Sequence, residues 1–214
     1  VTSIGKFAFS GNSSLTRVHL GSSLTSIGEG AFLGASSLAS LSVVPANSMY
    51  TVEDGILYSK GDAGRTLVLY LPTKTDTDVM VPDGTVALAD YAFASNTSLR
   101  RVVLPEGLTT IGYGAFDGDA NLTDIVIPDS VTVARGLVNN GLDTIELGSK
   151  VTELWMTPRD TPAPRHIIVR GGNDGEFYYE GKAANGRPDS VYFGEGVTSF
   201  TFWFDTPRVL VLPS

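Results

Sequence analysis

The chain has 214 residues, and 42% of them are hydrophobic, which is enough for a continuous folded core. Its formal net charge is −8 without a basic cluster, which argues against nucleic acid and anionic membrane surfaces as partners, because both attract concentrated lysine and arginine. Cysteine is absent, so disulfides, thiolate nucleophiles and cysteine-ligated metal sites are excluded. No apolar run approaches the ~18 residues of a membrane helix, and no secretion signal opens the chain.

A sequence repeat begins at the first residue. Its first copy reads Val1-Thr-Ser-Ile-Gly-Lys-Phe-Ala-Phe9, and near copies occupy 24–32, 85–93 and 108–116. The step is 23 residues from 1 to 24 and from 85 to 108. Because the chain starts inside this pattern, we expect it to be a piece of a larger protein.

The regular repeats of residues 1–45 show what each unit contains. Its Leu-x-x-Val-x-Leu part predicts a short strand, because two alternating apolar side chains point the same way and Pro or Gly then turns the chain. The Ile-Gly-x-x-Ala-Phe part predicts a turn followed by a short helical or 3₁₀ piece, with Phe filling the interior. One unit cannot bury its own apolar face, so the repeats predict a stacked solenoid. We expect an internal ladder of Phe9, Phe32, Phe93 and Phe116.

The repeat spanning 46–84 contains an insertion. The step from Leu41 to Val79 is 38 residues, which is the regular step of 23 residues plus an insertion of about 15. Residues 50–59 place two apolar segments around Asp54-Gly55, which predicts a β-hairpin that projects from the stack. A further strand is predicted over 66–71.

Regular repeats return over 85–130, whereas 131–214 keeps only the strand halves of the pattern. The first residue of each apolar strand pair serves as a marker for the predicted strands. These markers predict about nine strand-bearing turns, at Val18, Leu41, Val79, Val102, Ile125, Ile145, Ile167, Val191 and Leu210.

The repeat Leu-x-x-Val-x-Leu-Pro-x-x-Val-Thr-x-Ile-Gly-x-x-Ala-Phe resembles the BspA-like, or Treponema-type, leucine-rich repeats of bacterial surface proteins. The resemblance covers residues 1–130. It implies a single leucine-rich-repeat solenoid over 1–214, of the α/β horseshoe-like class but dominated by strands, with an extracellular or cell-surface location. Many family members carry Cys or Asn just after Ala-Phe. This chain has Gly or Ser near that place, so nothing is inferred from that Cys.

Catalytic groups are sparse. His19 and His166 lie in distant repeats, so a shared zinc site is disfavoured. Asp124 and Glu146 on neighbouring strands could flank a glycosidic bond, but two solvated carboxylates are the favoured interpretation. We therefore predict no catalytic residues, no enzymatic activity and no cofactor.

Two segments resemble the start of calcium-binding loops. Residues 117–121 lack the Gly and Glu that close such a loop, and 171–175 is a single copy of a motif that works by repetition. Turns are the favoured interpretation of both, and no metal site is predicted.

The strongest binding candidate is a strip of side chains on the concave face that the resemblance implies. Residues flanking the inward apolar pair should point outward, and several of them are apolar, so side by side they would form a patch of several hundred Å². The alternative is that they are only good strand formers on a pleated surface. The candidate site residues are Arg17, His19, Met80, Arg101, Val103, Asp124, Val126, Glu146, His166, Ile168 and Tyr192.

The family resemblance implies a non-enzymatic adhesion module that binds a host or bacterial surface protein or a glycan. Two alternatives remain open. The domain could be a rigid spacer without its own ligand, or, more remotely, a carbohydrate-active enzyme.

Overall fold

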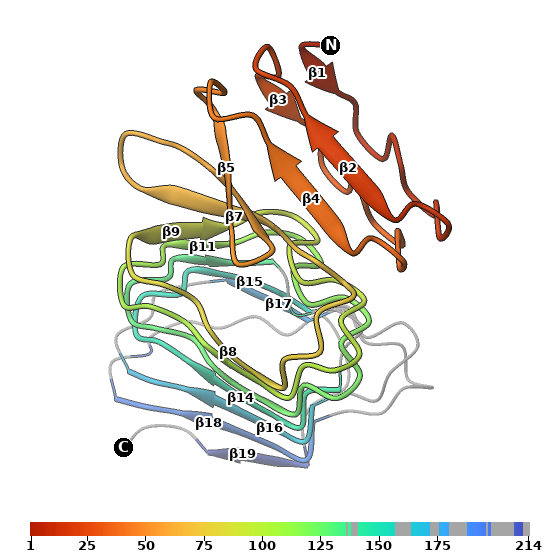
Figure 1. Ribbon diagram of the computed structural model, residues 1–214. Helices are drawn as coiled ribbons and strands as arrows, with labels where there is room; N and C mark the ends of the chain where they lie inside the picture. Colours follow the sequence, from red (N-terminus) through yellow and green to blue (C-terminus); the bar gives the residue numbers. More distant parts are fainter. Residues whose placement is uncertain are drawn as a thin grey trace.

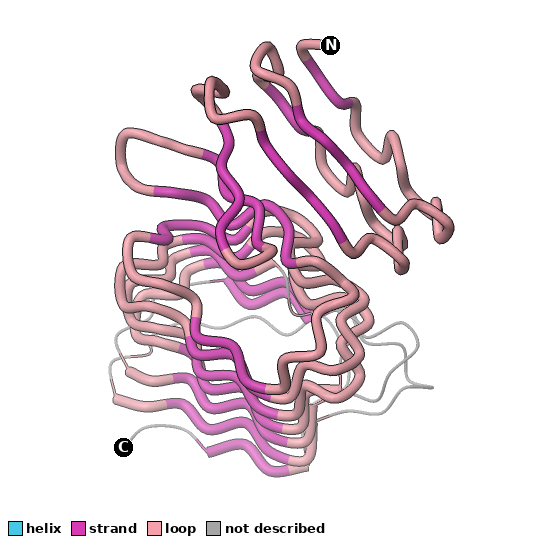
Figure 2. Tube along the Cα trace, in the orientation of Figure 1, coloured by secondary structure: helices cyan, strands magenta, loops and turns pink. Residues whose placement is uncertain are grey.

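A computed structural model describes residues 1–135, 137, 141–156, 164–171, 176–179, 188–195, 197 and 208–211. Within these ranges the chain winds into a stack of turns with a sheet along each of two sides (Figure 1). All regular structure in the described part is β-strand, as Figure 2 shows. No helix that could cross a membrane is found among these residues.

One side of the stack is a parallel sheet of seven strands, one from each successive turn. Its inward side chains, such as Ile125 and Ile145, are buried because alternate residues of a strand face opposite sides. The strands are β8 (Asp78–Met80), β10 (Arg101–Val103), β12 (Asp124–Val126), β14 (Thr144–Leu147), β16 (His166–Val169), β18 (Ser190–Phe193) and β19 (Val209–Val211).

The other side is an eight-stranded sheet, in the order β17-β15-β13-β11-β9-β7-β6-β5. From β7 onward its neighbours pair in parallel, whereas β5-β6 and β6-β7 are antiparallel. Its strands are β5 (Tyr50–Glu53), β6 (Ile56–Ser59), β7 (Arg65–Tyr70), β9 (Thr85–Leu88), β11 (Thr110–Ile111), β13 (Val133–Ala134), β15 (Glu153–Met156) and β17 (Glu176–Tyr179).

The first two repeats form separate parallel pairs. β1 (Ser3–Ile4) pairs with β3 (Ser26–Ile27), and β2 (Arg17–Leu20) pairs with β4 (Ser40–Val43). All nine marker residues therefore lie in strands, which confirms the repeat register. However, only seven of those strands form a continuous sheet, so the uninterrupted stack has about seven turns rather than nine.

The prediction of a short helical or 3₁₀ piece after Ile-Gly is wrong. In the third regular repeat, Tyr91, Phe93 and Ser95 donate their backbone N–H groups to the next turn of the solenoid, at 2.9, 2.8 and 2.7 Å. The residues between them close tight local turns, as in the bond from Ala92 N to Ala89 O. Because every second backbone N–H group bonds to a residue of the next turn, the i to i−4 hydrogen bonds of an α-helix cannot form.

The segment predicted to project as a hairpin belongs to the eight-stranded sheet. β5 and β6 pair antiparallel around Asp54 and Gly55, whose φ angles of 49° and 76° suit a type I′ turn. The side chains of β6 and β7 are divided between two different cores. Tyr58 and Tyr70 pack into the main core, whereas Leu57 and Leu69 pack with the N-terminal repeats. β6 and β7 are thus buried on both faces, because they lie between two hydrophobic cores.

The phenylalanine ladder is present in two pieces. Phe9 stacks on Phe32 at 5.6 Å between ring centroids, and Phe93 stacks on Phe116 at 5.3 Å. Tyr70 of the insertion stacks on Phe93 and adds a third ring to the second piece, so the break in the ladder lies between Phe32 and Tyr70. The interruption falls where the two cores meet.

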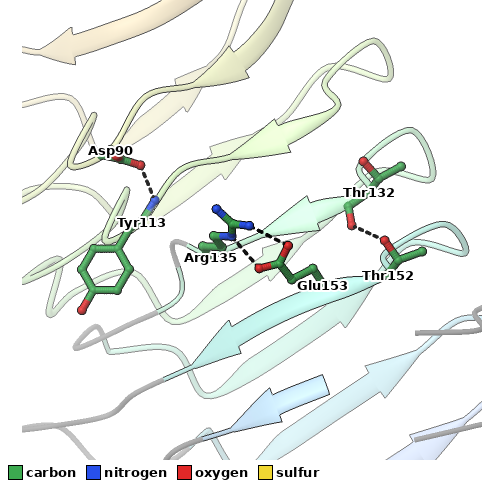
Figure 3. Close-up of polar contacts among 6 residues, drawn as sticks. All are labelled: Asp90, Tyr113, Thr132, Arg135, Thr152 and Glu153. Carbon is green, nitrogen blue, oxygen red and sulfur yellow. Dashed lines mark hydrogen bonds and ion pairs between the residues drawn. The ribbon is translucent and has the colours of Figure 1, made fainter. Parts of the chain in front are cut away.

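Polar side chains tie successive turns together along the eight-stranded sheet. Thr152 donates its hydroxyl to the carbonyl oxygen of Thr132 at 3.2 Å, and the Arg135 guanidinium makes two bonds to the Glu153 carboxylate (Figure 3). Thr109 makes the same kind of bond as Thr152, to the Val86 carbonyl at 3.0 Å. The threonine bonds repeat with the turns and therefore reinforce the stacking.

Candidate binding surface

The structure places most of the expected strip in register on the outer face of the seven-stranded sheet. Met80 lies opposite Val103, and Val126 opposite Glu146. The row continues in register through Ile168, Tyr192 and Val211. We call this row, from Met80 to Val211, the outer strip.

The outer strip exposes apolar side chains over much of its length. The exposed fraction is 75% for Met80, 48% for Val126 and 41% for Tyr192. Ile168 is half-buried beside Glu146, whose Oε1 accepts a hydrogen bond from Arg170 Nε at 2.7 Å. That hydrogen bond raises the pKa of Arg170. An ion pair therefore divides the strip into two apolar stretches.

Two residues of the first stretch, Val103 and Val126, line a hollow of about 450 Å³. Both valines belong to its apolar lining, and Arg101, Asp124 and Arg170 are among its polar lining. Sequence reasoning missed Arg170, which directly follows β16; its place one residue beyond the strand was the available signal. The hollow combines apolar area with charges of both signs.

A second row lies beside the strip and carries alternating charges. Arg101 lies between Asp78 and Asp124 in the sheet register. Further along this row, His166 Nδ1 is 2.8 Å from Ser190 Oγ. This row gives the strip a polar margin of defined pattern.

The two N-terminal candidates lie elsewhere. Arg17 and His19 belong to β2, which pairs only with β4, and His19 Nδ1 is 2.8 Å from Ser42 Oγ. The structure does not bring them into the row of the outer strip, because the insertion separates β4 from β8.

The carboxylates considered for glycoside chemistry are not direct neighbours. Asp124 lies opposite Thr144, and Glu146 lies opposite Val126, so the two sit on a diagonal of the sheet. Glu146 is also held by Arg170. The register thus gives no facing carboxylate pair at this point.

The first calcium-like segment holds a buried carboxyl group. Asp119 is fully buried, and its Oδ1 accepts the backbone N–H of Asn96 at 2.8 Å. Burial raises the pKa of Asp119 to about 8. Among the described residues, no group of three or more His, Cys, Asp or Glu side chains could hold a metal ion. The second such segment, 171–175, lies outside the described residues apart from Gly171.

Comparison with known families assigns the repeat. The model of the BspA type leucine rich repeat region matches residues 1–61 and 74–154, in six copies. The chain belongs to this family, which confirms the resemblance. The unmatched residues 62–73 contain β7, the strand that turns the insertion back into the solenoid. A comparison with curated protein sequences found no match.

Solved structures share the fold. A leucine rich cell surface protein from Faecalibacterium prausnitzii is 20% identical with a TM-score of 0.68, covering 96% of this chain and 52% of that one. A leucine-rich repeat protein from Eubacterium ventriosum is 27% identical with a TM-score of 0.68, covering 84% and 48%. The pneumococcal vaccine antigen PcpA is 22% identical with a TM-score of 0.73, covering 99% and 60%. This chain thus spans about half to three fifths of their length.

Proposed function

We propose that this repeat domain is a non-enzymatic binding module of a bacterial surface protein, and that the outer strip contacts its partner. The observation that carries the proposal is the in-register exposure of Met80, Val103 and Val126 beside the alternating charges of the second row. Apolar area with a polar margin is the composition of a protein–protein interface. The cell-surface description of the Faecalibacterium relative supports the location.

A protein partner fits the strip better than a glycan. Its exposed apolar residues are mostly aliphatic, and Tyr192 is the one aromatic side chain among the described strip residues. Aliphatic patches of this kind gain affinity by excluding water from matching apolar surface.

The test uses the complete 214-residue chain against two panels, purified extracellular-matrix proteins and immobilised glycans. We expect saturable binding to a matrix protein that is lost in Val126→Glu, while Ala63→Glu, an exposed residue between β6 and β7, binds normally. Binding that survives Val126→Glu would place the site elsewhere. Absence of binding to both panels would favour the rigid spacer.

A further inference from the structure

A gap interrupts the backbone hydrogen bonding between the second repeat and the insertion. In the first repeat, Phe7 N donates to Glu29 O at 2.9 Å and Phe9 N to Ala31 O at 2.8 Å. Gly30 and Phe32 are the equivalent residues of the second repeat, and their N–H groups have no hydrogen-bond acceptor among the described residues. Both residues are buried, so two backbone donors are left without the partners that buried N–H groups normally have.

The opposite wall of the gap carries an unused acceptor. Asp90 is the third-repeat equivalent of Glu29, yet within the described residues its carbonyl oxygen accepts no hydrogen bond. β7 pairs with β9 over Arg65 to Leu67 only, and Tyr70 N then bonds to Ala92 O. The inserted turn therefore supplies no backbone N–H group to the Asp90 carbonyl oxygen.

The unpaired groups line a cavity of about 360 Å³. Gly30, Phe32 and Asp90 all contribute to its wall. The Phe7 ring lies against Gly30 and meets the Tyr91 ring edge to face at 5.9 Å between centroids. The cavity thus has unpaired backbone donors on one side and an unpaired backbone acceptor on the other.

The charged residues that line this cavity are acidic. Glu29 and Asp90 are the charged residues in its lining. Lys6 pairs with Glu29, whereas Asp90 has no ion pair among the described residues, and its Oδ1 accepts the backbone N–H of Tyr113 at 2.6 Å (Figure 3). Burial, together with the nearby negative charges, raises the pKa of Tyr91 to about 12, so its hydroxyl stays protonated.

We propose that this gap binds one extended peptide segment of a partner protein by strand addition, with a basic side chain of that segment facing Asp90. The peptide carbonyls accept from Gly30 and Phe32, and a peptide N–H donates to the Asp90 carbonyl, as in other cases of β-augmentation. This site lies at the junction of the second repeat and the insertion, apart from the outer strip. It is therefore independent of the proposed function.

The probe is an acetylated and amidated heptapeptide, Lys-Val-Lys-Val-Lys-Val-Lys, added to the isotope-labelled full chain. We expect hydrogen exchange of the Gly30 and Phe32 amides to slow at least about tenfold, while the already bonded Phe7 and Phe9 amides do not change. The matching Glu-Val peptide should bind about tenfold more weakly, because its carboxylates face Asp90.

The variant Asp90→Asn keeps the Oδ1 acceptor for Tyr113 and removes the charge. It should weaken binding of the lysine peptide about three- to tenfold, whereas Asp83→Asn, on an exposed turn away from the cavity, should not. Unchanged exchange at Gly30 and Phe32, or equal affinity of the two peptides, would overturn the proposal. The proposal would also be overturned if the oligosaccharide triacetylchitotriose, and not the peptide, slowed hydrogen exchange of these two amides. Normal peptide binding by Val126→Glu is expected, which separates this test from that of the outer strip.

Discussion

The ring of Tyr70 stacks on the ring of Phe93 with centroids 5.0 Å apart and planes inclined by 26°. Tyr70 thereby takes the place in the ladder that a repeat phenylalanine would hold. Its backbone N–H bonds to Ala92 O, just as Phe9 N bonds to Ala31 O. The insertion is therefore a modified turn of the solenoid that supplies its own ring.

Loss of a ladder ring should destabilise the stack strongly. Phe116→Ala removes a fully buried ring and should lower the free energy of unfolding by roughly 3 to 5 kcal/mol, since a cavity remains. Tyr70→Ala should behave similarly, whereas Tyr70→Phe keeps the ring and loses only the hydroxyl bond to Asp76. Urea unfolding of the three variants measures the difference. A Phe116→Ala midpoint equal to that of wild type would contradict the stacked ladder.

Asn47 joins the insertion to the N-terminal repeats. Its buried Nδ2 donates to the carbonyl oxygens of Gly21 and Leu24 at 2.8 and 3.0 Å, and its Oδ1 accepts from the backbone of Met49 and Tyr50. Asn47→Ala should therefore cost about 2 to 4 kcal/mol, because it leaves buried backbone groups unpaired.

Thermal unfolding checks this expectation, with Asn12→Ala as the control because Asn12 is exposed. The Asn47 variant should unfold at clearly lower temperature than the control. Equal melting temperatures would show that water replaces all four bonds without loss.

Asp119 should make stability depend on pH. Its folded-state pKa of about 8 lies above the ordinary value of 3.8, so the folded protein holds a proton that the unfolded chain releases. Stability is then greatest below pH 4 as far as this group is concerned, and it declines as the pH rises from about 4 to about 8. Asp119→Asn mimics the neutral form and should remove this decline.

Melting temperatures at pH 5 and pH 9 measure the effect. Wild type should lose more stability between these values than Asp119→Asn, and the variant should be the more stable protein at pH 9. Parallel pH profiles would mean that Asp119 is ionised in the folded state.

The repeat register was predictable because its signals are local. Period-two apolar pairs such as Val102 with Leu104 locate each strand without knowledge of distant contacts, and all nine markers fell in strands. A turn followed by a short helical or 3₁₀ piece was predicted after Ile-Gly, with Phe filling the interior. The structure replaces the helix by turns, since the left-handed φ angles of Tyr91 and Gly114 are incompatible with a continuing helix.

The joint between the two cores was harder to predict. The runs Ile56-Leu57-Tyr58 and Leu67-Val68-Leu69 are apolar on both faces, which is typical of strands buried on two sides. That signal was available, but it does not say which core each face meets. The break between β4 and β8 follows from this tertiary packing and displaces Arg17 and His19 from the outer strip.

The outer strip is the central functional claim, and Val126 is its most informative position because it is exposed in the sheet and lines the hollow. The decisive measurement is the dissociation constant of a matrix protein for wild type, Val126→Glu and Ala63→Glu by surface plasmon resonance. The strip predicts about 30-fold weaker binding for Val126→Glu, since a charge then faces the apolar contact, and no change for Ala63→Glu. Equal dissociation constants for wild type and Val126→Glu would contradict the account.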